Sequence, residues 1–172
     1  MKQLLEHFYP DDYHCYRQAG NAALLAGDAA TARTHLTSAI IAAGPNAPKF
    51  TAALLVDRAR AHVELKDLAG ARADLDRALA LAPSDATALL LSAALAARQG
   101  DIGRAQRDIA RASELAPSDP DVMLQQGTIA AAAGDLEAAK AVWGAVVKAA
   151  PGSDAAALAR RRLEGVGAAP PK

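Results

Sequence analysis

The sequence has little of several features that point to particular functions. Cys15 is the only cysteine, so no disulfide can form within the chain. Lys and Arg together number 19, the same as Asp and Glu, so no net charge attracts nucleic acid and none is predicted as a partner. No stretch reaches the roughly 18 to 20 consecutive apolar residues of a membrane span. We expect a soluble, cytoplasmic protein, or a periplasmic one if a signal peptide has been removed.

Motifs for chemistry are also missing from the sequence. The 4 histidines lack the i, i+4 spacing of a zinc-binding helix. His14 and Cys15 are adjacent, so on a helix they would point about 100° apart. No phosphate loop of the G-x-x-x-x-G-K type occurs, and carboxylates such as Asp74 and Asp76 are expected on solvated helix faces. We therefore predict no enzyme activity, no cofactor and no metal, with a Cys15 thiol function as a distant alternative.

What the chain does contain is an alanine-rich sequence with a fixed period. Pro83, Pro117 and Pro151 are equally spaced, since 117 − 83 and 151 − 117 are both 34. A period of this length indicates one structural unit copied along the chain. Other positions that keep the same step are Asp67, Asp101 and Asp135, then Ala71, Ala105 and Ala139, then Leu75, Ile109 and Trp143, then Ala78, Ala112 and Val146.

Each unit is predicted to be two helices joined by a short break. Apolar residues recur at helical spacing over residues 51–65 and 68–81, 85–98 and 102–115, and 119–133 and 136–149, and a first unit covers 13–43. Glycines at the breaks are expected to end the first helices in the left-handed conformation, with Lys66 in that place in the second unit. The aspartate after each break is expected to cap the second helix.

The spacing predicts an insertion and two special ends. The step from Asp28 to Asp67 is longer than the period, since 67 − 28 is 39 and the period is 34, so five extra residues are present. Because Pro48 can occupy the first turn of a helix, we expect the insertion to extend that helix, a surface loop being the alternative. Residues 154–164 are expected to form a capping helix, and 165–172 a disordered tail. One domain is predicted.

The pattern resembles the tetratricopeptide repeat, whose first helix carries a large residue, then Leu-Gly, then Tyr, and whose second carries Ala, an aromatic and a closing Pro. The fourth unit fits with Met123, Gly127, Ala139, Trp143 and Pro151, and the first with Tyr16, Gly20, Ala32, Leu36 and Ala39. The middle units fit with Leu55, Ala59 and Leu75, and with Leu89, Ala93 and Ile109. The tyrosine position departs from the family, since it holds Ala23, His62, Ala96 and Ala130.

The resemblance implies an all-α fold, a right-handed α-solenoid of four helical hairpins plus a C-terminal capping helix. The repeats would cover about residues 13–46, 52–85, 86–119 and 120–153, after a lead-in or cap at 1–12. Small residues at Gly20, Ala59, Ala93 and Gly127 support this independently, because a larger side chain would overpack a close helix crossing.

The resemblance also implies a function as an interaction scaffold. The first helices would line a concave groove that binds a peptide or helix of a partner protein. Alternatively, the apolar groove residues pack between repeats and the arginines are merely solvated. The groove residues expected from helical phase are Arg17, Asn21, Val56, Arg60, Leu90, Ala94, Leu124 and Thr128.

One binding mode of the family does not fit this sequence. Some members hold a partner's C-terminal carboxylate between Lys or Arg and Asn from three repeats. Arg17 and Asn21 resemble the share of the first repeat. However, Asp57 stands where the second repeat needs Asn, and Thr87 and Leu91 stand where the third needs cations. We therefore expect no binding of a chaperone tail by this route.

The N-terminal segment concentrates the aromatic residues. Phe8, Tyr9, Tyr13 and Tyr16 are among only 2 Phe, 3 Tyr and 1 Trp in the chain. One interpretation is an edge that makes a homodimer, which is the alternative function, because Tyr and Phe bury a large area at little entropic cost. The other is a cap over the exposed end of the first repeat.

Overall fold

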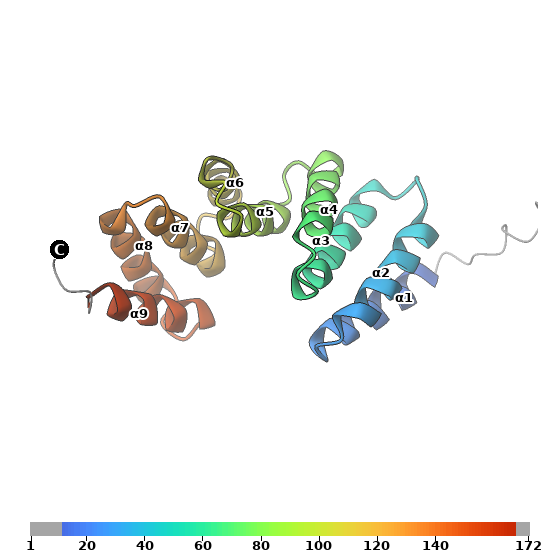
Figure 1. The fold of residues 1–172 in the computed structure, drawn as a ribbon, viewed down its shortest axis with the longest axis horizontal. Helices are drawn as coiled ribbons and strands as arrows, with labels where there is room; N and C mark the ends of the chain where they lie inside the picture. The colour runs from blue at the N-terminus through green and yellow to red at the C-terminus, as the bar shows by residue number, and fades with distance from the viewer. Residues whose placement is uncertain (1–11, 168–172) are drawn as a thin grey trace, which may run out of the picture. The chain divides into compact units, whose positions relative to one another are not determined.

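The structure is a computed structural model that describes residues 12–167. Within this range all regular structure is helical (Figure 1). Residues 1–11 and 168–172 lie outside the described range, so the predictions for Phe8 and Tyr9 fall outside it as well. The described helices are α1 (Asp12–Leu25), α2 (Ala29–Ala43), α3 (Pro48–Glu64), α4 (Leu68–Leu81), α5 (Ala86–Arg98), α6 (Ile102–Leu115), α7 (Pro120–Ala132), α8 (Leu136–Ala149) and α9 (Asp154–Gly167).

The helices fall where the sequence period places them. Helices α4, α6 and α8 have the predicted bounds, and α3 begins at Pro48, so the insertion extends this helix as expected. The prediction of disorder from residue 165 is wrong at its start, because α9 continues to Gly167. Leu163 and Val166 pack against a buried apolar cluster, and this packing stabilises the end of α9.

The breaks between paired helices have the predicted geometry. Gly27, Gly100 and Gly134 have φ of 77°, 79° and 89°, and Lys66 takes φ of 61° despite its Cβ. This conformation costs a non-glycine residue roughly 1 to 2 kcal/mol. The aspartate that follows each of these four residues accepts a backbone N–H bond in the first turn of the next helix, which confirms the predicted caps.

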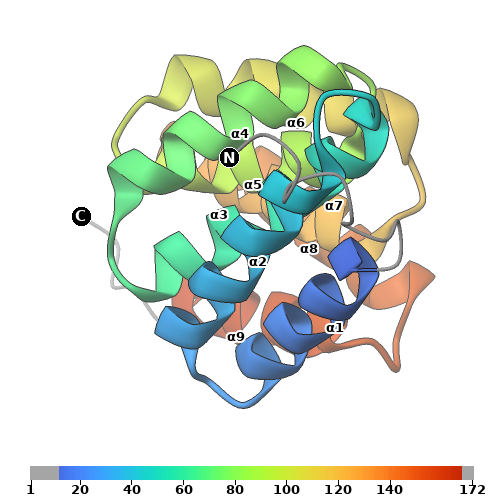
Figure 2. The same cartoon turned by 90° about the vertical axis from the view of Figure 1, so that its right-hand side faces the viewer.

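The chain divides into two compact units between Pro83 and Ser84, where the sequence led us to expect one domain. The first unit contains the hairpins α1–α2 and α3–α4, with α2 packed against α3. Figures 1 and 2 both show α1 and α2 side by side. The second unit contains the hairpins α5–α6 and α7–α8, and α9 packs on both α8 and α7.

The two helices of a hairpin cross where the first helix has a small residue. A Cβ on Gly127 would lie 2.6 Å from Cδ1 of Trp143, and a Cβ on Gly20 would lie 2.7 Å from Cγ of Leu36. Both distances are well below van der Waals contact. Ala59 and Ala93, at the same phase, are fully buried. The small residue thus sets how closely the second helix approaches, as the sequence predicts.

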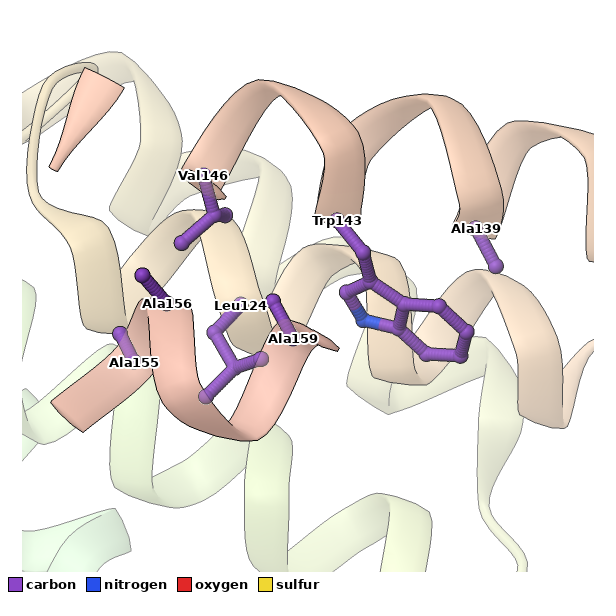
Figure 3. Close-up of a cluster of buried hydrophobic side chains, with 7 residues drawn as sticks. All are labelled: Leu124, Ala139, Trp143, Val146, Ala155, Ala156 and Ala159. Atoms are coloured by element: carbon purple, nitrogen blue, oxygen red, sulfur yellow. The ribbon is translucent and has the colours of Figure 1, made fainter. Parts of the chain in front are cut away.

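The apolar core at the C-terminal end is built by three helices (Figure 3). Trp143 and Val146 of α8 point toward the space that they share with Leu124 of α7. Helix α9 closes this space with three buried alanines, Ala155, Ala156 and Ala159. Because alanine has no side chain beyond Cβ, α9 can approach the indole and the leucine closely. Helix α9 therefore packs as the capping helix that the sequence predicts.

The crossing at Gly127 gives a direct stability test. Gly127→Leu should lower the free energy of unfolding by roughly 1 to 3 kcal/mol, because the larger side chain meets the Trp143 ring. Urea unfolding measures the difference. Gly144→Ala in α8 is the matched control, since a Cβ there meets nothing within 4 Å, and it should not destabilise the fold. Equal stability of Gly127→Leu and wild type would show that the crossing lies elsewhere.

Candidate functional site

Three charged side chains on the first helices of the first unit lie close together. Arg17 and Arg60 were expected to line the groove, and the third residue is Asp57. Nε of Arg17 in α1 donates to Oδ2 of Asp57 in α3 at 3.1 Å. Nη1 of Arg60 lies 3.8 Å from Oδ1 of the same carboxylate. The Arg17 guanidinium also lies over the Phe50 ring, with Cζ 5.5 Å from its centroid. Asp57 is buried, so its charge is held between the two cations that were expected to line the groove.

Two of the expected groove residues do not offer their side chains to a partner. Val56 is 4% exposed and Leu124 is 8% exposed. Leu124 lies in the cluster that α9 covers, because the capping helix occupies the face of α7 that the groove expectation left open. The set of candidate contact residues is therefore revised at these two positions, where the alternative of packing within the fold describes the side chains better.

The other expected groove residues keep some exposure. Leu90 and Ala94 are half-buried and stand one turn apart on α5. Asn21 is half-buried on α1, and the Arg60 side chain is 49% exposed. Thr128 is half-buried, but its Oγ1 donates to the backbone oxygen of Leu124 at 2.8 Å. Arg60 in the first unit, and Leu90 and Ala94 in the second, thus keep part of their side chains exposed.

The aromatic residues at the start of α1 are engaged within the chain. The Tyr13 ring lies 4.6 Å from the Phe50 ring, between centroids, and 4.2 Å from the His14 ring. Tyr16 packs against the buried cluster formed by Leu36, Ala39 and Leu54. Both tyrosines are half-buried, so the fold of the first unit already uses part of the surface expected to form a self-association edge.

A buried ion pair in the first unit is absent from the sequence-based predictions. Asp74 is 6% exposed, which corrects the expectation that it lies on a solvated face. Arg58 holds it with two hydrogen bonds, from Nη2 to Oδ1 at 2.6 Å and from Nε to Oδ2 at 2.7 Å. Nη1 of Arg58 also donates to Oγ1 of Thr37 in α2 at 3.1 Å. One guanidinium therefore links three helices.

The sequence feature from which this pair could have been predicted is the spacing of its two residues within the repeat. Arg58 and Asp74 are 16 residues apart, and one period later Ser92 donates to Asp108, also 16 residues away, at 2.6 Å. A polar pair thus joins the two helices of both middle hairpins. Asp74 also has cations beside it on its own helix, which suggested a solvated face, and its partner becomes visible only when the repeat phase is followed across the hairpin.

His62 lies between two carboxylates next to this pair. Its Nδ1 is 2.8 Å from Oδ2 of Asp67, and its Nε2 is 3.7 Å from Oδ2 of Asp74. The backbone N–H of Gly70 donates to Oδ1 of Asp67 and lowers the pKa of this carboxyl, and His62 lowers it further against an opposing effect of burial. The position that the repeat pattern gives to tyrosine is therefore occupied in this unit by a histidine that lies beside two carboxylates.

The described residues supply no assembly for metal chemistry. Across residues 12–167, no three or more His, Cys, Asp or Glu side chains gather in a way that would hold a metal ion. Over the same range no helix is both long enough and apolar enough to cross a bilayer.

The paired helices, the fixed period and the small residues at each crossing define a helical-repeat protein. Family models of the tetratricopeptide repeat match residues 56–121 and 121–153, together more than half of the 172 residues. The chain belongs to the tetratricopeptide repeat family, whose fold is a scaffold for protein interactions and is not a catalytic fold. No curated protein matches the sequence.

Solved structures share the fold. A tetratricopeptide repeat protein from Parabacteroides merdae is 19% identical with a TM-score of 0.70, over 90% of this chain and 59% of that one. The chain thus spans less than two thirds of that protein. YrrB, described as having an unusual peptide-binding site, is 21% identical with a TM-score of 0.68, over 87% and 74%. The first such domain of human RPAP3 is 26% identical with a TM-score of 0.66, over 75% and 98%.

The free energy of unfolding of variants at Arg58 and Asp74 should show the cost of leaving a buried charge without its partner. Arg58→Met alone should lower the free energy of unfolding by about 3 kcal/mol, because it leaves the Asp74 carboxylate buried without its cation. Arg58→Met with Asp74→Leu should recover most of that loss. Urea unfolding of the two single variants and the double variant measures the coupling. Additive losses would contradict a direct, buried interaction.

Acid should weaken the start of α4 through Asp67. Because the folded-state pKa of Asp67 lies below its ordinary value of 3.8, its contribution is present at higher pH and is lost as the pH falls through the folded-state pKa. Unfolding measured at about pH 5 and about pH 3 should show a smaller acid-induced loss for Asp67→Asn than for wild type. Glu64→Gln, exposed on the same hairpin, is the control. An identical loss in Asp67→Asn and wild type would contradict this role.

Proposed function

We propose that this chain binds a peptide or a helix of a partner protein on the open faces of its first helices, and that it performs no chemistry. The observation that carries the proposal is the half-exposed apolar pair Leu90 and Ala94. These residues stand four apart on α5, so their side chains form one stripe that apolar side chains of a partner can cover. Arg60 offers an exposed cation on α3, another first helix.

The relatives support peptide binding in general and leave its mode open. One solved structure, 23% identical with a TM-score of 0.66, is described as the first such domain of Spaghetti (RPAP3) bound to the HSP90 peptide SRMEEVD. In this chain Asp57 already engages Arg17 and lies within 3.8 Å of Arg60. An incoming carboxylate would have to compete with Asp57 for these cations. We therefore propose that apolar contacts provide most of the affinity and that Arg60 adds selectivity.

The two cations Arg17 and Arg60 should give the chain a modest preference for acidic partners. Arg17, Arg60 and Asp57 together carry a formal charge of +1, and the Arg60 side chain reaches solvent. An acidic side chain of a partner can pair with Arg60 on the first unit without displacing Asp57. Such an exposed pair contributes little affinity, on the order of 0 to 1 kcal/mol, and mainly selects among similar sequences.

Affinity capture from a lysate of the source organism tests the proposal. A variant with Arg60→Glu and Leu90→Asp should retain at least about tenfold less partner than wild type. Leu90→Asp places a charge in the apolar contact, and Arg60→Glu reverses the charge of the exposed cation. The matched control carries Arg77→Glu and Leu115→Asp, which make the same chemical changes on exposed positions of second helices.

Both variants must first show the helical content and unfolding midpoint of the wild type. Retention by wild type and control with loss from the first-helix variant is the expected result. Equal retention by all three proteins would place the binding surface elsewhere on the chain.

A further inference from the structure

Helix α1 has an exposed face that the other first helix of its unit buries. Cys15 and Ala22 are exposed on this face. The residues at the same repeat positions of α3 are Leu54 and Ala61, and both are fully buried. Leu54 packs in a cluster with Leu36 of α2, the second helix of the preceding hairpin. On α1, therefore, a helix face that is packed in α3 is open to another surface.

Leu25 lies on the same face of α1. It follows Ala22 by three residues, so the two side chains are one turn apart. Leu25 is 92% exposed, the highest value among the large apolar side chains of residues 12–167. The same repeat position of α3 holds Glu64, a charged residue that is also exposed. Leu25 thus adds no packing to its own unit, and its burial would become favourable if another surface covered it.

Four residues make up this face, and we call them the α1 seam. Their spacing of three, four and three residues is that of the contact line between two packed helices. Arg17 is the only residue with a permanent charge from 13 to 27, and its side chain is directed to Asp57 of α3. Two copies of the seam would therefore meet without repulsion between like charges. The seam residues are Cys15, Gln18, Ala22 and Leu25.

The seam is complementary to a second copy of itself when the two helices are antiparallel. Cys15 and Leu25 lie five residues on either side of Gly20, and Gln18 and Ala22 lie two residues on either side. A twofold axis at the level of Gly20 would place the large Leu25 of each copy opposite the small Cys15 of the other. A parallel pair would instead place like residues together, large against large and small against small, which packs less evenly.

We propose that two copies of this chain associate through the α1 seam, with their α1 helices antiparallel. The contact is isologous, as in most dimers. One pair of 14-residue helices covers less than the roughly 1,200 Å² of a stable complex, so the association is weak and depends on concentration. The seam differs from the aromatic edge expected from the sequence, because Tyr13 and Tyr16 already pack within the first unit. The proposal is independent of the partner-binding function.

Disulfide trapping tests the geometry of this contact. In Leu25→Cys the new thiol and Cys15 are ten residues apart on one helix, about 15 Å, which is too far for a disulfide within the chain. In the antiparallel dimer each new thiol lies opposite Cys15 of the other copy. Oxidised glutathione should therefore link Leu25→Cys into a covalent dimer at least about tenfold faster than Ala73→Cys, the control on the exposed face of α4.

Sedimentation equilibrium measures the association without a cross-link. Leu25→Lys should raise the dissociation constant of the dimer at least about tenfold, because the ammonium group would lose water in the contact. Ile41→Lys is the matched control, since Ile41 is likewise a large exposed apolar residue in the last turn of a helix, α2. It should keep the association of the wild type.

The two measurements are read together. The expected result is association of wild type and Ile41→Lys, its loss in Leu25→Lys, and fast linking of Leu25→Cys. A wild type that stays monomeric at concentrations up to about 1 mM overturns the proposal and leaves the seam to another occupant. Linking of the wild type through Cys15 as fast as that of Leu25→Cys shows a different contact and also overturns it. A dimer that persists in Leu25→Lys places the association on another surface, with the same consequence.

Discussion

The close approach of two helices at one small residue is the constraint on which the rest of this structure depends. Where Gly127 faces the Trp143 ring and Gly20 faces Leu36, the second helix approaches a backbone that has no side chain in the way. This contact fixes which face of each first helix is used inside the hairpin. Because the other faces then point away from that hairpin, the same constraint determines where neighbouring helices and other molecules can reach the first helices.

The local structure could be predicted because each repeat carries its own signals. A proline, a small residue at the crossing and an aspartate at the break recur once per period, so the bounds of α4, α6 and α8 followed directly. Even the positive φ of Lys66 was predictable, since the repeat demands that conformation where the other units place glycine. These features depend on contacts within a few turns of the chain, and sequence patterns report such contacts well.

The candidate site was less predictable because its exposure depends on neighbours. Leu124 has the phase of a groove residue, yet α9 covers it, and the sequence gives no direct measure of how deep a capping helix sits. Asp74 looked solvated because nearby cations share its helix, while its actual partner is Arg58 across the hairpin. Asp57 likewise engages Arg17 from another hairpin. Helical phase gives the direction of a side chain, and the depth of burial requires the packed structure.

The polar pairs make the pairing of helices more specific in a core that is mostly alanine and leucine. Apolar residues of similar size tolerate exchange, so they specify a hairpin only weakly. Arg58 satisfies its donors on α2 and α4 at once, and Asp74 is costly to bury without it. We infer that this pair favours the correct pairing of α3 with α4 and of both with α2. Ser92 and Asp108 make the corresponding link in the next hairpin.

The proposed function requires partners to bind the open faces of the first helices. Alanine methyl groups offer the most direct measurement, because alanines occupy both kinds of surface. In a protein labelled at alanine methyl groups, NMR signals are followed while the captured partner is added. Binding on the first helices should shift the signals of Ala94 and Ala97 of α5 and leave unchanged those of the exposed Ala73, Ala110 and Ala145 on second helices. Shifts confined to the second helices would contradict it.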